Sequence, residues 1–123
     1  MFEYKQSTGE LMRDGVAVGV CYSGHGLGLN NPATQFMADL GPIPQGVFTI
    51  GEAFHHPVAG PVCMRLTPDD ATETHGRAGF MMHGDNCEMD HTASDGCVIA
   101  ALEFREQVRA ARDAGDDQLM VVA

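Results

Sequence analysis

Two short segments, residues 80–86 and 93–99, hold the residue types that thiol chemistry requires. The first ends an apolar run with His83, and the second begins one with Cys97, directly after Gly96. Cysteine attacks as the thiolate, and a positive neighbour such as an imidazolium must lower its ordinary pKa of about 8.5. A glycine before the cysteine lets the backbone turn sharply, so that amide N–H groups can face a developing oxyanion. The pattern predicts Cys97 as a nucleophile and His83 as its base.

The same residues also fit other interpretations. A free cysteine is commonly a small buried hydrophobic residue, and a histidine at a strand end is commonly a packed side chain. Zinc binding is a further alternative, because four possible ligands lie close together in the chain: His83, Cys87, His91 and Cys97. Their spacings, with three, three and five intervening residues, do not match the paired ligands of ordinary zinc folds. We therefore expect no metal and no cofactor.

The acidic composition argues against one class of function. The 123 residues include 17 acidic and 7 basic ones, for a formal net charge of −10. Binding to phosphates needs clustered Lys and Arg, so we expect no nucleic-acid partner. The length and the hydrophobic content of 44% fit one domain over residues 1–123.

The chain contains no targeting signal that we can identify. No run is long and apolar enough to cross a bilayer, and residues 1–6 lack the basic and apolar regions of a signal peptide. We expect synthesis in the cytoplasm and no membrane insertion. The four cysteines form no C-x-x-C pair, so free thiols are the expectation, with a Cys87–Cys97 disulfide formed on delivery as an alternative.

The residue patterns predict the elements that must position these groups. Alternation of apolar residues and turn signals predict short strands at residues 2–7, 11–12, 16–21, 47–50, 62–66, 79–83 and 118–122. Residues 23–32 are too glycine-rich for regular structure, and residues 41–46 form a rigid proline-containing turn. The spacing of Phe104, Val108 and Ala111 predicts one helix over residues 102–114. Several short strands with one late helix indicate a mainly β fold, a sandwich or barrel-like domain.

Several short motifs follow one another along nearly the whole chain. They are Tyr-Ser-Gly at 22–24, a Gly/Asn loop ending in Asn31-Pro32, Gly-Pro-Ile-Pro-x-Gly at 41–46, His-Gly-Asp at 83–85 and Ala-Ser-Asp-Gly-Cys-Val-Ile at 93–99. In this combination the chain resembles the compact L,D-transpeptidase-related proteins of the DUF2778 group, which include type VI secretion effectors that attack peptidoglycan.

The resemblance implies a β-sandwich of the L,D-transpeptidase (YkuD-type) catalytic type with one short C-terminal helix. It also implies roles: Cys97 as nucleophile, His83 as general base, and the carbonyl of Gly84 as the group that orients the imidazole. The amides of Asp95, Gly96 and Cys97 would form the oxyanion hole. Tyr22, Ser23 and Ser94 are candidate substrate-binding residues.

The chain departs from housekeeping L,D-transpeptidases at two places. The loop between His83 and Ser94 is shorter, and residues 98–100 lack the Arg or Asn that usually follows the cysteine in those enzymes. The residue that holds the substrate carboxylates is therefore not assigned. Arg77 and Arg65 are candidates because basic residues are scarce.

The activity that the resemblance implies is cleavage of the bond between the L-centre of the third stem residue and D-alanine in peptidoglycan tetrapeptides. A thioester on Cys97 would pass to water (L,D-carboxypeptidase), to a D-amino acid (exchange) or to a stem amine (transpeptidation). Expected partners are stem peptides, with a secretion-system component and an immunity protein if the chain is an antibacterial effector. It would act in the periplasm of a target cell after delivery, or on release by lysis. The alternative is a non-enzymatic wall-binding or phage structural module with the same fold.

Overall fold

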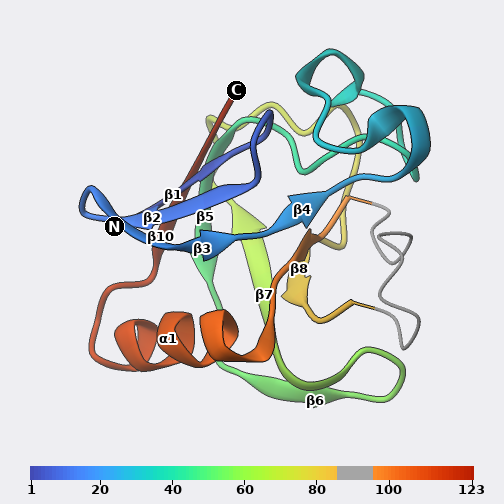
Figure 1. Ribbon diagram of the computed structural model, residues 1–123. Helices are drawn as coiled ribbons and strands as arrows, with labels where there is room; N and C mark the ends of the chain where they lie inside the picture. Colours follow the sequence, from blue (N-terminus) through green and yellow to red (C-terminus); the bar gives the residue numbers. More distant parts are fainter. Residues whose placement is uncertain (86–95) are drawn as a thin grey trace.

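The computed structural model describes residues 1–85 and 96–123 and has a mainly β architecture with one α-helix, as predicted (Figure 1). The strands form a ten-stranded sheet in the order β3-β2-β1-β10-β5-β7-β8-β9-β4, and β6 pairs with β7 outside this path. Their bounds are β1 Phe2–Lys5, β2 Glu10–Arg13, β3 Val16–Val20, β4 Tyr22–Ser23, β5 Gly46–Ile50, β6 Phe54–His56, β7 Gly60–Pro68, β8 Met81–His83, β9 Val98–Ile99 and β10 Gln118–Val122.

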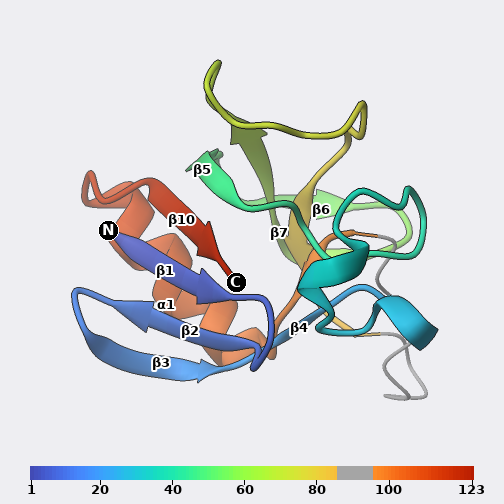
Figure 2. The ribbon, with the colours of Figure 1, turned by 90° about the horizontal axis from the view of Figure 1, so that it is seen from above.

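The two ends of the chain meet inside the sheet. Strand β10 pairs in parallel with β1, Phe2 opposite Leu119, and antiparallel with β5, Leu119 opposite Phe48. The first three strands form an antiparallel meander at one end of the strand order. Figure 2 shows β1, β2, β3 and β10 lying over α1, apart from β7 and β8. The last strand therefore joins the N-terminal meander to the strands that carry His83.

Helix α1 (Leu102–Asp113) covers one side of the sheet with a single face. Val108 and Ala111 are buried and Phe104 packs against the core, which confirms the predicted apolar spacing. The ring of Phe104 occupies the space that a Cβ at Gly19 of β3 would fill, so glycine there lets this ring pack against the strand. Arg105 is also buried on this face, which the apolar pattern does not predict.

Strand β3 lies where it was predicted, but its valines do not pack on one face as predicted. Only Val18 packs against the core, whereas Val16 and Val20 are exposed. The register with β2 shifts at Val18, because Leu11 pairs with Gly19 while Met12 pairs with Ala17. Strand β3 also ends the strand order and has a paired neighbour only in β2. The alternating valines stabilise an edge strand without filling the interior.

The loops contain short elements that the sequence patterns did not predict. The glycine-rich loop includes two 3₁₀ turns, Gly26–Gly28 and Pro32–Thr34. Strands β4 and β9 have two residues each, and β6 lies between the predicted strands at 47–50 and 62–66. No helix within residues 1–85 and 96–123 has the length and apolar character needed to span a bilayer.

Candidate active site

His83 and Cys97 lie on neighbouring parallel strands. His83 is the last residue of β8, and Cys97 directly precedes β9. The register pairs Met82 with Val98, and both of these side chains are fully buried in the core. Successive strand residues alternate between the two faces of a sheet. The alternation therefore puts His83 and Cys97 together on the face opposite this core.

The imidazole of His83 is held by the backbone of the next residue. Its Nδ1 lies 2.8 Å from the carbonyl oxygen of Gly84, the contact that the resemblance implied. A carbonyl oxygen only accepts, so the proton of a neutral ring sits on Nδ1 and Nε2 is left as the basic nitrogen. The strand ladder continues with the Ala100 amide donating to the His83 carbonyl at 2.9 Å. Ring and backbone are thus both fixed.

The neutral form of His83 is favoured by its surroundings. The residue is 8% exposed, and burial lowers its pKa below the ordinary value of 6.5. The positive charge of Arg105 lowers this pKa further, while the Gly84 carbonyl and Asp85 act against the shift. A neutral imidazole at neutral pH is the form that can accept a proton from a thiol.

A buried arginine supports the turn before Cys97. Arg77 donates from Nη1 to the carbonyls of Gln35 (2.6 Å) and Pro42 (2.7 Å), and from Nη2 to that of Gly41 (3.0 Å). Gly96 has φ +125°, and a Cβ on it would collide with Arg77 Nη2. These donors of Arg77 therefore bind the protein's own backbone. Glycine is favoured at position 96 by its positive φ and by the close approach of Arg77.

Ser23 connects this support to the cysteine itself. Its hydroxyl donates to the Cys97 carbonyl at 2.8 Å and accepts from the Ile43 amide at 2.8 Å. Gln6 donates from Nε2 to the Ile43 carbonyl at 2.8 Å. Ser23 is fully buried, so this structure places it behind Cys97 rather than facing solvent. The proline-containing turn at 41–46 is thus linked through Ser23 to the backbone of Cys97.

The Cys97 thiol differs from the other described thiols in its exposure. Cys97 is partly exposed, with Sγ 3.8 Å from the Gly79 carbonyl oxygen, whereas Cys21 and Cys63 are buried. Burial raises the pKa of the Cys21 thiol to about 12, which leaves it protonated. Among the thiols in residues 1–85 and 96–123, Cys97 is the one placed to react.

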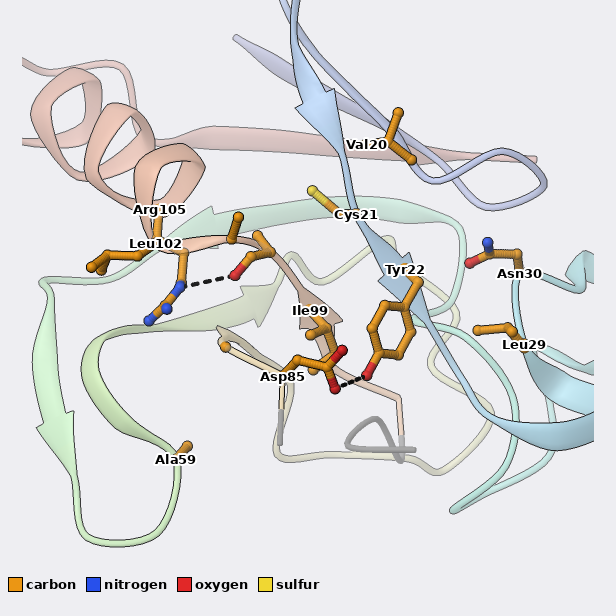
Figure 3. A pocket seen from close by; sticks show the side chains of 13 residues that line it. Val20, Cys21, Tyr22, Leu29, Asn30, Ala59, Asp85, Ile99, Leu102 and Arg105 are labelled. Atoms are coloured by element: carbon orange, nitrogen blue, oxygen red, sulfur yellow. Dashed lines mark hydrogen bonds between the residues drawn. The ribbon is translucent and has the colours of Figure 1, made fainter. Parts of the chain in front are cut away.

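A cavity of about 580 Å³ is lined by residues that adjoin His83 in the chain, among them Gly84 and Asp85 (Figure 3). His83 and Cys97 are not among the described residues that line it. Ile99, which pairs with both His83 and Tyr22, forms part of its wall. Figure 3 shows Tyr22 donating from its hydroxyl to Asp85, at 2.6 Å, on one side of the cavity. Arg105 extends from the start of α1 on the other side. Tyr22 thus lines a cavity, as a substrate-binding residue would.

Several predicted site residues lie outside the described residues. Ser94 and Asp95 belong to this group, so the structure describes two of the three predicted oxyanion-hole amides, those of Gly96 and Cys97. Cys87 and His91 are in the same segment, which includes one partner of the possible disulfide and two of the four zinc ligands.

Two comparisons with known proteins found a match to this chain. The Tlde1 domain family model matches residues 19–123. A crystal structure of a cysteine-to-serine mutant of Enterococcus faecium L,D-transpeptidase is similar to it with a TM-score of 0.60 and 14% sequence identity. That similarity covers 98% of this chain but 48% of the other, so this chain spans about half of its length. No curated protein matches.

The structural similarity agrees with the L,D-transpeptidase-like fold expected from the motifs. The family match covers β4, β8, β9 and the helix, and therefore both His83 and Cys97. The chain belongs to the Tlde1 domain family.

Proposed function

We propose that this protein is a cysteine-dependent peptidoglycan enzyme that cleaves the bond between the L-centre of the third stem residue and D-alanine. The observation that carries the proposal is the placement of His83 and Cys97 on one face of neighbouring strands, with His83 Nδ1 held by Gly84. This leaves Nε2 to act toward the thiol. Membership of the Tlde1 domain family and the L,D-transpeptidase-like fold support it.

In the proposed first step, His83 Nε2 takes the proton of the Cys97 thiol, and Sγ attacks the carbonyl carbon of the third stem residue. The resulting oxyanion accepts hydrogen bonds from the amides of Gly96, Cys97 and Asp95, each worth about 3 kcal/mol of transition-state stabilisation. Collapse breaks the C–N bond, and the imidazolium gives its proton to the departing D-alanine amine. A thioester on Cys97 remains.

The second step transfers the acyl group to an acceptor. His83 removes a proton from the attacking water or amine, and the thioester C–S bond breaks to regenerate Cys97. Water gives a tripeptide, a free D-amino acid gives an exchanged stem, and a stem amine gives a 3–3 cross-link. We propose hydrolysis or exchange as the main outcome, because the described part of the chain is compact and shows no second substrate lobe.

The test is intact-mass analysis after incubation with a disaccharide-tetrapeptide, alongside Cys97→Ala and His83→Gln. We expect a thioester adduct or released D-alanine with the wild type alone, and unchanged thermal melting in both variants. D-alanine release by Cys97→Ala would refute the proposal. Stem binding without adduct or release, with the thiol shown to be reduced, would support the wall-binding module instead.

We also propose that the enzyme acts on the wall of a target bacterium as an antibacterial effector. The support is its membership of the Tlde1 domain family. Expression in a bacterial host with an added export signal should lyse the cells, whereas the Cys97→Ala variant exported in the same way should not. Toxicity without export, or toxicity of Cys97→Ala, would contradict this role. A delivery component and an immunity protein are the partners that the role requires.

A further inference from the structure

Arg105 is a buried cation, and one terminal nitrogen of its guanidinium makes no hydrogen bond to the described residues. Nε donates to the Ala100 carbonyl at 3.0 Å, and Nη1 donates to the carbonyls of Pro61 (2.6 Å) and Val62 (3.3 Å). Within residues 1–85 and 96–123, Nη2 has no hydrogen-bond partner and no carboxylate forms an ion pair with Arg105. The residue is 7% exposed and lines the 580 Å³ cavity.

A buried guanidinium without an anionic partner is costly, because the charge has lost water without gaining an opposite charge. Arg77 is equally buried, but it donates from both of its terminal nitrogens to backbone carbonyls. Arg105 is also the one basic side chain among the described residues that line the cavity. A guanidinium without a carboxylate partner in the described part of the chain therefore borders a space large enough for a ligand, and its Nη2 lies close to Gly84 of the same lining.

The position of the cavity connects it to the catalytic pair. Gly84, whose carbonyl holds His83, lines the cavity, and a Cβ on Gly84 would be 2.8 Å from Arg105 Nη2. Ile99 lies in the register row between His83 and Tyr22. A substrate attacked by Cys97 can therefore extend past His83 into this cavity without leaving the sheet face.

We propose that Arg105 binds a carboxylate of the peptidoglycan stem in this cavity and so determines which stems are substrates. The inference rests on the proposed function, since it takes the stem peptide as the ligand. Leu29 and Leu102 supply apolar walls for an aliphatic chain. Asp85, which accepts from the Tyr22 hydroxyl, disfavours a ligand carboxylate on its own side of the cavity and so favours one at Arg105. A free carboxylate at the far end of diaminopimelate and the carboxylate of the terminal D-alanine both have the required chemistry.

The experiment measures binding to the Cys97→Ala protein, in which no turnover interferes. The ligands are three tetrapeptides with diaminopimelate at the third position and D-isoglutamine at the second, so that two carboxylates remain. One peptide keeps both, one is amidated at the far end of diaminopimelate, and one is amidated at D-alanine. We expect one amidation to weaken binding about 10- to 100-fold, since a charge-assisted hydrogen bond is lost. The amidation that does so identifies the carboxylate.

Variants of Arg105 test the residue itself. Adding Arg105→Met should abolish the preference for the free carboxylate, and Arg105→Lys should restore part of it by returning the charge. Arg109→Met, on the same helix but half-exposed and beside Glu106, should leave the preference unchanged. A purely structural role would lower stability without changing the ratio between free and amidated peptides.

The results distinguish failure of the Arg105 inference from failure of the proposed enzymatic function. Equal binding of all three peptides, or no stem binding at all, overturns the role of Arg105. Carboxylate preference in Cys97→Ala with no D-alanine release by the wild type overturns the enzymatic proposal alone. D-alanine release without any carboxylate preference overturns the Arg105 inference alone.

Discussion

The guanidinium of Arg77 occupies the space that a side chain at Gly96 would need. This relationship connects a distant loop to the turn before Cys97, because the same guanidinium donates to the carbonyls of residues 35, 41 and 42. The glycine before Cys97 is thus required by its positive φ and by close contact with a buried cation. The two requirements can be separated by mutation.

Gly96→Ala should destabilise the protein more than Gly115→Ala. Both glycines have positive φ, +125° and +107°, so backbone strain at an alanine in either position should lower the free energy of unfolding by about 1–2 kcal/mol. Only Gly96 has Arg77 against it, whereas nothing lies within 4 Å of a Cβ at Gly115. Thermal melting of the two variants measures the difference, and equal losses would show that the contact with Arg77 is unimportant.

Arg77→Met should lower the free energy of unfolding by about 3 kcal/mol or more, because two buried carbonyls and one partly buried carbonyl lose their donors. Arg65→Met is the control: Arg65 is exposed and lies over the ring of Phe54, so the cost should stay below about 1 kcal/mol. Urea unfolding gives both values. A stable Arg77→Met protein with weakened stem binding would instead indicate that Arg77 binds the substrate.

Ser23→Ala should reduce both stability and kcat, because it leaves the Cys97 carbonyl and the Ile43 amide without their shared partner. We expect a loss of about 1–3 kcal/mol in stability. KM should change little if Ser23 positions Cys97 rather than binding substrate. Ser7→Ala, at an exposed turn, controls for loss of a hydroxyl. An increase in KM at unchanged kcat would identify Ser23 as a substrate contact.

The pH dependence follows from the direction of the His83 pKa shift. Burial lowers this pKa below 6.5, so the unfolded chain binds the proton more readily than the folded one. Stability from His83 is therefore complete above about pH 6.5 and is lost as the pH falls below it. We expect the acidic limb of kcat/KM to lie below pH 6.5 as well, since Nε2 must be unprotonated.

Denaturant unfolding between pH 5 and pH 7 checks the stability part of this prediction. His83→Gln should flatten the pH dependence, whereas His55→Gln, on the exposed side of β6, should not. An acidic limb well above pH 6.5 would mean that another group controls the rate.

Brief treatment with iodoacetamide under native conditions should modify Cys97 much faster than Cys21 or Cys63. Cys97 is partly exposed, while the other two are buried and the pKa of Cys21 is raised to about 12. Peptide mapping by mass spectrometry measures each site, and denatured protein should react at all of them. Equal labelling of Cys21 and Cys97 in the native state would contradict the described burial.

The regular elements were predictable because their signals are local. Alternation identified the longer strands, and the spacing of Phe104, Val108 and Ala111 identified α1. Strands β4 and β9 were not predictable, because a two-residue strand has no period. The parallel pairing of β1 with β10 joins residues more than a hundred positions apart, and no local pattern encodes it.

Within the candidate site, His83 and Cys97 were singled out by their residue types and context, whereas composition did not indicate the buried arginines. Arginine is rarely buried, so Arg105 gave no composition signal. Its helical position did contain one: it follows Phe104 and precedes Val108 by three residues, which places it on the inward face. Arg77 lies in an irregular loop, and its burial depends on carbonyls from residues far away in the chain.

The central place of β10 has a consequence for biosynthesis. Strand β10 separates β1 from β5 in the strand order, so these two strands cannot be joined until residues 118–122 have left the ribosome. Until then β1 and β5 each present an unpaired edge. The sheet closes only when β1 pairs with β10, which is distant in sequence. Completion of the sheet that includes β8 and β9 therefore depends on this long-range pairing with β10.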